Sequence, residues 1–588
     1  MEWIHSRTLD LRETGDLKKE IVMDLVYTWV NGSETELNIM KAHYQALSPL
    51  FKNLKKLPEK HKRPGRQHGR GRGRKRDLGA DQTMNRFRDM NELKYSVRSV
   101  AQYAASGMFR KIFILTTEVV DRVSGNKRGQ VPQWLDLEKA KGMVELVPHR
   151  MVYDDENFLP SFNSLSIESQ MHHIPGMADI FAYLNDDVFF AKPVGAADFW
   201  TPLYGFVFHA YSFSKISPYR PTPLGRTAVV GEEHSLEYTN SILSQQFGAR
   251  HRAYIAHIPH ILSVPIMEEI QSLWPKEFKT TSSHRFRGEG KGFEIQVSFL
   301  LAHYVMERLR ETQLASWWKY RLDKNQDGQL DWSERQELIR MVEYYDQNQI
   351  KDKTSPRTWN SLTFPSFLED YKERIRSIGI PWTNSTTYSL TGMDEYPFML
   401  SSSDLKKSSK HQYTRPYATS NRLRACKFEI DFCLGKDFRN KAVDTVDAST
   451  GKGSMFERLA FTEFHCGDCL LHIVRRVNPS SGMGAFLPLD RDSEAYERVM
   501  RDLAKYNYVI GASEASFIQL YDGKQAQGAL NSLMKSRDNY TYICINDDVE
   551  SNPGIVERVR NIFLKYMEER FPTPSPWEKS KSGIEIES

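Results

Sequence analysis

The chain has 588 residues, and its 40% hydrophobic and 12% aromatic content supports large packed cores and excludes a mainly disordered protein. The formal net charge is +5 and the basic residues cluster locally, so we do not expect the protein as a whole to bind nucleic acid. No stretch approaches the ~20 apolar residues of a membrane span, and residues 1–20 contain no signal-peptide core. The expectation is either a cytosolic protein or one whose N-terminal anchor is not in this chain.

The first predicted strand is the β-branched and aromatic run IVMDLVYTWV at 21–30, after an N-terminal extension at 1–20. It ends in the turn signal Asn31-Gly32-Ser33. A strand that runs into such a loop near the start of a chain suggests the first β-to-α turn of an α/β sheet. Turns of this kind line ligand crevices at the carboxyl ends of strands. An ordinary hairpin turn is the alternative.

A segment rich in Lys, Arg and Gly follows at 53–80 and shows no apolar periodicity, which predicts a disordered basic loop. Its RGRGRKR portion could contact RNA or anionic membranes, but no aromatic residues interleave with the charges. We therefore expect no nucleic-acid partner.

Helical and strand patterns then alternate. Apolar residues at helical spacing predict a helix within 85–105, and the runs at 111–117 and 143–147 predict buried strands. This alternation is the signature of an α/β fold. Residues 164–170 are predicted to lead into a helix that places Glu168 and His172 one turn apart.

Two adjacent carboxylates, Asp186 and Asp187, directly follow an apolar run in FAYLNDDVFFAK at 181–192, which predicts a buried strand with acids at its end. Such a pair is costly to bury without a positive partner, and a divalent cation shared with substrate phosphates is the usual one. A turn or cap is the alternative. The chain repeats the arrangement in TYICINDDVE at 541–550, which favours one metal or polyphosphate site built from distant segments.

Histidines and arginines gather between 252 and 299. Arginine grips phosphate oxygens bidentately and histidine titrates near neutrality, so the mixture fits phosphate binding and acid–base catalysis. For any one of them alone, a structural role is the more common use. The residues are His257, His260, His284, Arg285 and Arg287.

The sequence DKNQDGQLDWSE at 323–334 matches a complete EF-hand calcium loop, with Gly328 at the sharp turn. The flanking sequences look helical, so we expect an inserted EF-hand at 311–348 that binds calcium. In an enzyme, a lone EF-hand is more often a structural clamp than a sensor. The expected ligands are Asp323, Asn325, Asp327, the backbone of Gln329, Asp331 and Glu334.

The rest of the chain divides into a polar linker at 349–425, a C-terminal part at 426–572 and a disordered tail at 573–588. All five cysteines lie in this last third. Four of them could form two disulfides or a four-cysteine zinc site, or stay free, and disulfides are favoured in a secreted or luminal protein. The cysteines are Cys426, Cys433, Cys466, Cys469 and Cys544.

These motifs, in this order, resemble the regions that define the Stealth family of sugar-phosphate transferases. The residues that carry the resemblance are DLVYTWVNGS, RDMNELKYSVRSV, FAYLNDDVFF, the HIPH-to-FEIQVSF region and YICINDDVE. The family includes the GlcNAc-1-phosphotransferase catalytic subunit and a fungal xylosylphosphotransferase. The resemblance implies an α/β fold of glycosyltransferase type, with a mixed or parallel sheet and flanking helices assembled from 21–310 and 426–572.

The resemblance also implies a reaction: a sugar-1-phosphate passes from a nucleotide diphosphate sugar, most simply a UDP-sugar, to a glycan hydroxyl, and a nucleoside monophosphate is released. Mg²⁺ or Mn²⁺ on Asp186 and Asp187 would neutralise developing charge. Arg285 would hold phosphate oxygens, and His260 or Glu168 would be the general base, His260 being preferred. The implied donor-site residues are Trp29, Asn31, Gly32, Asn185, Arg287, Asn546 and Asp547.

By the same resemblance, the protein would act in the Golgi lumen or secretory pathway on a glycan or glycoprotein acceptor, and a homodimer is compatible with it. Sequons at Asn384 and Asn539 agree with a luminal location. The alternatives are a metal-dependent glycosyltransferase that transfers sugar alone, and a catalytically inactive calcium-binding protein.

Overall fold

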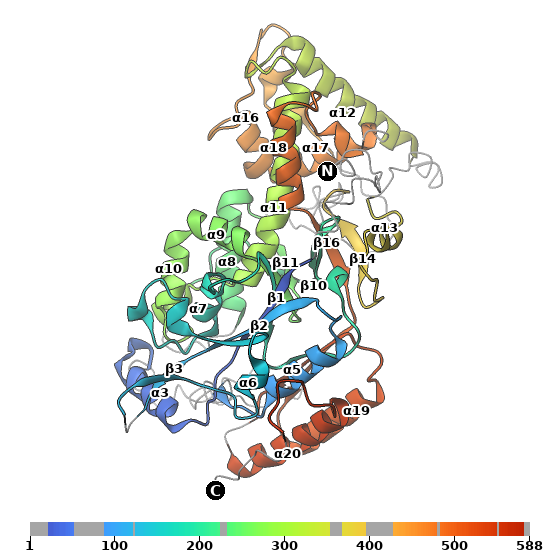
Figure 1. Ribbon diagram of the computed structural model, residues 1–588. Coiled ribbons are helices and arrows are strands. Elements are labelled where there is room, and N and C mark those ends of the chain that lie inside the picture. Colours follow the sequence, from blue (N-terminus) through green and yellow to red (C-terminus); the bar gives the residue numbers. More distant parts are fainter. Residues whose placement is uncertain are drawn as a thin grey trace, which may run out of the picture.

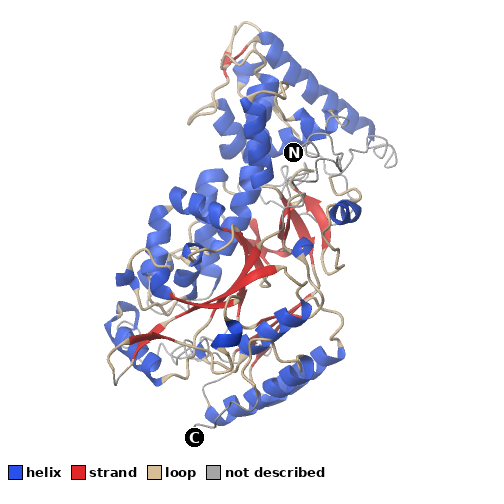
Figure 2. Ribbon diagram, viewed as in Figure 1, coloured by secondary structure: helices blue, strands red, loops and turns tan. Residues whose placement is uncertain are grey.

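The computed structural model describes residues 21–51, 87–121, 124–223, 232–352, 367–394, 427–478, 482–549 and 552–580. It is a mixed α/β protein with several sheets, as predicted (Figure 2). The expected N-terminal extension and most of the basic loop lie outside the described residues. None of the helices in the described ranges is both long and apolar enough to cross a membrane.

The central sheet has five strands in the order β12-β6-β1-β2-β5 (Figure 1). Its members are β1 (Met23–Thr28), β2 (Phe109–Thr116), β5 (Val144–Pro148), β6 (Ile180–Asn185) and β12 (His260–Ser263). The first four are parallel and β12 is antiparallel to β6. Their continuous apolar runs are those of strands buried on both faces. The strands predicted at 21–30, 111–117, 143–147 and 181–184 are therefore confirmed.

The order of these strands creates a topological switch point between β1 and β6. From β1 the chain moves outward to β2 and β5, and it then returns to the opposite side of β1 as β6. The last residues of the two neighbours, Thr28 and Asn185, lie opposite each other in the register. Open α/β sheets bind ligands outside the carboxyl ends of the strands at such a point.

Helices cover both sides of the central sheet (Figure 1). The helix predicted within 85–105 is α5, which begins only after Asn91, a residue with φ of 70°. The predicted helical pairing of Glu168 with His172 is wrong, because α7 ends at Glu168 and His172 lies in a separate 3₁₀ turn. The helices are α3 (Thr35–Leu47), α5 (Glu92–Tyr103), α7 (Ser164–Glu168), α8 (Glu232–Phe247), α9 (Val264–Leu273), α10 (Pro275–Ser283) and α11 (Val297–Trp317).

A second sheet joins the centre of the chain to its C-terminal part. In it β18 (Tyr542–Asp547) lies between β7 (Val188–Phe190) and β17 (Ala515–Leu520), antiparallel to the first and parallel to the second. Helices α19 (Gly523–Lys535) and α20 (Pro553–Arg570) run beside it at the bottom of Figure 1. The C-terminal part thus completes the core.

A third sheet has the order β14-β16-β9-β8. Its strands are β14 (Thr387–Thr391), β16 (Tyr508–Ala512), β9 (Gly205–Phe208) and β8 (Trp200–Thr201). The strand β14 and the helix α13 (Tyr371–Ser377) lie in the span expected to be a polar linker. That expectation is wrong for this portion, because alternate residues of β14 are buried against β16.

The predicted disordered tail is also ordered at its start. Glu578 is buried and accepts hydrogen bonds from Arg98 of α5 at 2.7 and 2.8 Å. The Asp136 N–H donates to the Trp577 carbonyl, which ties the same segment to the edge of the fold. A charged, short sequence gave no sign of this docking because both partners are far away in the chain.

A helical lobe stands at the top of Figure 1. It contains the end of α11 together with α12 (Trp332–Asp352), α16 (Met455–Glu457), α17 (Phe464–Val477) and α18 (Glu494–Lys505). In the same lobe β13 (Gln329–Leu330) pairs with β15 (Val446–Asp447). Two other strand pairs complete the described strands elsewhere in the fold. They are β3 (Glu118–Val120) with β4 (Lys127–Gly129), and β10 (Ala210–Ile216) with β11 (Arg252–Ile255).

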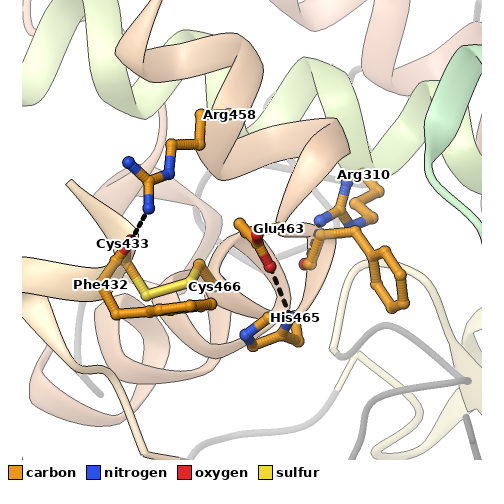
Figure 3. Close-up of a disulfide and its surroundings, with 8 residues drawn as sticks. Arg310, Phe432, Cys433, Arg458, Glu463, His465 and Cys466 are labelled. Atoms are coloured by element: carbon orange, nitrogen blue, oxygen red, sulfur yellow. Dashed lines mark hydrogen bonds and ion pairs between the residues drawn. A yellow bond between two sulfur atoms is a disulfide. The ribbon is translucent and has the colours of Figure 1, made fainter. Parts of the chain in front are cut away.

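The cysteines of the lobe are used as disulfides. Cys433 at the end of α15 (Ile430–Cys433) is bonded to Cys466 of α17, and Arg458 donates to the adjacent Phe432 carbonyl (Figure 3). Cys469 is disulfide-bonded as well. These three residues bear out the disulfide alternative and exclude the zinc one for themselves, whereas Cys426 lies outside the described residues.

A buried ionic network attaches the lobe to the rest of the protein. Asp468 of α17 accepts hydrogen bonds from Arg310 of α11 and from Arg250, which precedes β11. Arg250 and Arg252 also pair with Glu307 of α11. All five side chains are buried, so each charge depends on the others for compensation.

Replacement of Asp468 should therefore weaken the fold strongly. We expect Asp468→Asn to lower the free energy of unfolding by about 3–5 kcal/mol, because two buried guanidinium groups lose their carboxylate. Urea unfolding followed by circular dichroism measures this. The control is Glu145→Gln, which removes one end of an exposed ion pair with Lys111 and should cost about 0–1 kcal/mol. Equal effects of the two variants would contradict the assignment.

Candidate functional site

The two Asn-Asp-Asp segments lie side by side, as the repeated motif indicated. Cys544 of β18 is opposite Val188 of β7, and the Ile545 N–H donates to the Asp187 carbonyl at 3.0 Å. Asp186 and Asp187 form the tight turn between β6 and β7 at the switch point. The second segment begins at Asn546, at the end of β18. Two stretches far apart in sequence thus meet at the switch point of the central sheet.

Two further acids join the first pair, and the sequence did not single them out. Glu92 is the first residue of α5, and Asp89 lies in the segment just before it. Burial, followed by repulsion from Asp187 and Asp89, raises the pKa of Asp186 well above its usual value. Burial, followed by Asp186 and Asp89, does the same to Glu92. Acids at the start of a predicted helix are usually explained by their favourable interaction with the helix dipole. The sequence therefore does not indicate that Asp89 and Glu92 lie beside Asp186.

The acid of the second motif is held differently. The Arg88 guanidinium donates to both carboxylate oxygens of Asp547, at 2.8 and 2.6 Å. Asp548 accepts from Gln519 at 3.0 Å. The second motif therefore brings a neutralised carboxylate to the switch point, whereas the negative charge is concentrated around Asp186.

The loop after β1 is held by an amide clamp. The Gln130 side chain accepts from the Asn31 N–H at 2.9 Å and donates to the Asn31 carbonyl at 3.0 Å. It also donates to Glu34 at 2.6 Å. Gly32 packs so closely on Phe87 that a β-carbon would lie 1.4 Å from the Phe87 carbonyl oxygen. Trp29 is buried beside this loop.

Tyr183 of β6 connects several predicted residues. Its hydroxyl donates to Asn185 Oδ1 at 2.7 Å and lies 3.2 Å from the Thr28 hydroxyl. Its ring stacks on His260 with centroids 6.4 Å apart. The same hydroxyl interacts with Glu168. The ends of β1, β6 and β12 therefore share one polar face.

Glu168 and Arg287 lie together beside this face. Burial raises the pKa of Glu168 to about 7, and the positive charge of Arg287 opposes that shift. Arg287 donates to the Ser164 hydroxyl at 2.6 Å. Arg285 is used otherwise, since it donates to the carbonyls of Asn157 and Leu159 and lies over the Tyr44 ring.

The predicted histidines, His257, His260 and His284, lie in different environments. Burial, followed by the charges of His257 and His209, lowers the pKa of His260 to about 3. His257 instead lies beside Asp187, whose raised pKa it partly offsets, and beside Cys544. His284 is removed from this group and pairs with Glu294 at 3.2 Å. His257 is thus the histidine in contact with the acidic cluster.

The predicted calcium loop turns at Gly328, and its carboxylates accept hydrogen bonds from the loop's own backbone. Gly328 has φ of +80°, and its N–H donates to Asp323 Oδ2 at 3.1 Å. The Glu334 oxygens accept from the N–H groups of Lys324 and Asp331, at 2.8 and 3.0 Å. Asp323 is buried, yet its Oδ1 has no hydrogen-bond partner among the described residues. The other predicted ligand side chains, those of Asn325, Asp327 and Asp331, are exposed on the same loop.

The fold is that of an α/β protein with acidic residues gathered at a switch point, and parts of the chain are similar to known proteins. Three family models match, in chain order: Stealth protein conserved region 2 at 86–207, conserved region 3 at 256–307 and conserved region 4 at 531–583. Over these three regions the chain is similar to proteins of the Stealth family. Region 2 includes both Asp89 and the first acidic pair, and region 4 includes β18.

Curated relatives carry matching names. An exopolysaccharide phosphotransferase of Streptomyces coelicolor is 32% identical over 268 residues, 45% of this chain and 24% of the relative. The 3-O-alpha-D-mannopyranosyl-alpha-D-mannopyranose xylosylphosphotransferase of Cryptococcus neoformans var. grubii is 23% identical over 501 residues, which are 74% of this chain and 54% of the relative. A capsular polysaccharide phosphotransferase of Haemophilus influenzae is 27% identical over 302 residues, which are 51% of this chain and 70% of the relative. The chain thus spans about a quarter and about half of the first two relatives.

The raised pKa of Glu168 predicts a pH dependence of stability. Between the ordinary carboxyl pKa and about 7, the folded state holds a proton that the unfolded state has lost, so stability falls as the pH rises through this window. We expect Glu168→Gln to remove that loss and to be more stable than the wild type by about 2–3 kcal/mol at pH 8, with little difference at pH 4.5. Urea unfolding at both pH values measures the difference, and a pH-independent difference would contradict it.

Proposed function

We propose that the protein transfers a sugar-1-phosphate from a nucleotide diphosphate sugar, with a UDP-sugar as the expected donor, to a hydroxyl of a glycan. The acceptor oxygen attacks the sugar-bearing phosphorus, the bond from that phosphorus to the bridging oxygen breaks, and a nucleoside monophosphate leaves. The observation that carries the proposal is the convergence of both Asn-Asp-Asp segments with Asp89 and Glu92 at the switch point. The printed names of the relatives, all phosphotransferases, support it.

A divalent ion, Mg²⁺ or Mn²⁺, fits the carboxylates of Asp186 and Asp187. Their raised pKa values report unrelieved negative charge in a buried setting, which a hard cation with oxygen ligands relieves. When bound, such an ion neutralises charge on the diphosphate. Asp547 already pairs with Arg88, so its part is to fix the end of β18 beside this site.

The remaining chemistry is positioning and one proton transfer. Glu168 has a pKa of about 7, close to the working pH, which suits a general base better than the strongly lowered pKa of His260. We therefore rank Glu168 above His260 for that role and keep His260 as a neutral hydrogen-bonding group. Arg287, beside Glu168, is the cation available to phosphate oxygens, while Arg285 holds the loop at Asn157.

The donor would lie against the clamped loop of Trp29, Asn31 and Gly32 and between the amides of Asn185 and Asn546. This placement follows from the ends of β1, β6 and β18, which surround the switch point. The acceptor is a glycan or glycoprotein, in line with the polysaccharide and mannose-containing acceptors in the relatives' names.

We also propose that the protein works in the Golgi or another compartment of the secretory pathway. Disulfide use at Cys433 and Cys466 fits an oxidising compartment. The asparagines of both sequons, Asn384 and Asn539, are exposed, as glycan attachment requires.

Calcium at the EF-hand completes the proposal. The buried, unpartnered Asp323 oxygen and the buried Glu334 carboxylate suit the first and last ligand positions of such a loop. Because Gln329 and Leu330 pair with β15, calcium would brace two segments of the helical lobe against each other. This favours a structural clamp over a role in the reaction.

The reaction is tested by mass spectrometry of the products. With Mn²⁺ or Mg²⁺, a panel of nucleotide sugars and mannose-rich acceptors, we expect the acceptor to gain sugar plus phosphate and a nucleoside monophosphate to be released. Asp186→Asn should reduce the rate at least about 100-fold, because a metal ligand is lost. The control is Asp179→Asn, an exposed acid just before β6. A gain of sugar alone, with nucleoside diphosphate released, would instead make the protein a glycosyltransferase.

Calcium binding is tested by titration calorimetry on the whole protein in magnesium buffer. Glu334→Gln should weaken binding at least about tenfold, because the loop loses its last charged ligand. In the wild type, calcium at 100 times its dissociation constant should stabilise the fold by about 2.7 kcal/mol. Glu337→Gln, an exposed neighbour, should bind calcium as the wild type does. Undiminished binding by Glu334→Gln would place the ion elsewhere.

A further inference from the structure

Three potential metal ligands of different chemistry meet beside the acidic residues at the switch point. Asp187 comes from the turn between β6 and β7, His257 from the turn between β11 and β12, and Cys544 from β18. Their ligand atoms all lie within 4.8 Å of one another. The Cys544 thiol donates to Asp187 Oδ2 at 3.6 Å. Three elements that are distant in sequence thus present one carboxylate, one imidazole and one thiol to the same point.

This ligand set differs in kind from the carboxylates around Asp186. Mg²⁺ takes oxygen ligands, whereas a thiolate with an imidazole selects a borderline-soft ion such as Zn²⁺. Three protein ligands with a fourth position open to water is the usual arrangement of a zinc ion that is not purely structural. Cys544 is the free cysteine of the described chain, so its sulfur is available for such a bond.

The site has an approach from outside. Phe517 of β17 is opposite Cys544 in the sheet register and packs edge-on against the His257 ring, with centroids 5.9 Å apart. Phe517 itself is 51% exposed. Cys544 is buried and His257 is half-buried, so an ion entering past Phe517 would reach the imidazole first and the thiol at the inner end.

We propose that Asp187, His257 and Cys544 form a binding site for a transition-metal ion of the zinc class. On binding, the ion forms a bond to the Cys544 sulfur, and the thiol proton passes to solvent. An inhibitory effect then rests on the proposed function. Zinc at this site binds Asp187, which is also a ligand of the ion that the donor diphosphate needs, so zinc inhibits the transfer. The enzyme would then run on Mg²⁺ or Mn²⁺ and be switched off by zinc.

Cobalt is the probe, because it replaces zinc and is coloured. The full protein, freed of transition metals and kept in calcium and magnesium buffer, is titrated with Co²⁺. We expect one ion per chain with the intense visible bands of tetrahedral cobalt, and a near-ultraviolet charge-transfer band from thiolate to cobalt. Zinc should displace it. Both signals are measured without any sugar donor, so they do not depend on the proposed reaction.

Variants locate the ion. Cys544→Ser should lose the charge-transfer band, and His257→Ala should weaken cobalt binding at least about tenfold. His43→Ala, an exposed histidine on α3, is the matched control and should bind as the wild type does. Circular dichroism checks that each variant is folded. If Cys544→Ser fails to fold, alkylation of the wild-type thiol under mild denaturation, with and without zinc, replaces it, and zinc should slow the alkylation.

The inhibitory consequence is tested separately as the ratio of transfer rates with and without zinc within each variant. In Cys544→Ser, half-inhibition should need at least about ten times more zinc than in the wild type. A wild-type protein without the charge-transfer band, or a band that survives in Cys544→Ser, would overturn the site. A band with no zinc inhibition would keep the site and overturn its inhibitory role, and absence of any transferase activity would bear on the proposed function alone.

Discussion

The concentration of four carboxylates, one buried and three half-buried, at one point is the constraint on which this structure depends. Burial raises the pKa values of Asp89, Glu92, Asp186 and Asp187, and repulsion from neighbouring carboxylates raises those of Glu92 and Asp186 further. A chain that needed only a stable fold would not keep such a group at the end of a buried strand. The arrangement becomes favourable when a cation and the phosphates that it binds are present, which links the electrostatics directly to the proposed chemistry.

The rest of the fold serves to hold this group in place. The strand β18 returns from the far end of the chain to lie against β7, and the Arg88–Asp547 pair joins its end to the segment before α5. The docked tail at Glu578 holds the middle of α5 through Arg98. The helical lobe is attached to the rest of the fold through Asp468, which binds Arg250 and Arg310.

Much of this could be predicted from the sequence where the signal is local. The apolar runs of β1, β6 and β18 predicted buried strands, and the repeated Asn-Asp-Asp motif indicated that two of these strands share a site. What could not be predicted depends on contacts between distant residues. Gln130 is an unremarkable polar residue until it clamps Asn31, and Glu92 looks like a helix-end charge until Asp186 lies beside it. The choice of His260 over Glu168 failed to foresee that burial would depress one pKa and raise the other.

The central claim is that the acidic site at the switch point binds a nucleotide diphosphate sugar through a divalent ion, and equilibrium binding tests it most directly. Calorimetry of a UDP-sugar panel should be run on the wild type with Mn²⁺, on the wild type with the ion removed by chelation and calcium restored, and on Asp186→Asn. The account predicts that at least one sugar nucleotide binds, that binding requires Mn²⁺ or Mg²⁺, and that Asp186→Asn abolishes it. If a UDP-sugar binds as tightly without Mn²⁺ and Mg²⁺, or binds as tightly to Asp186→Asn, the central claim is contradicted.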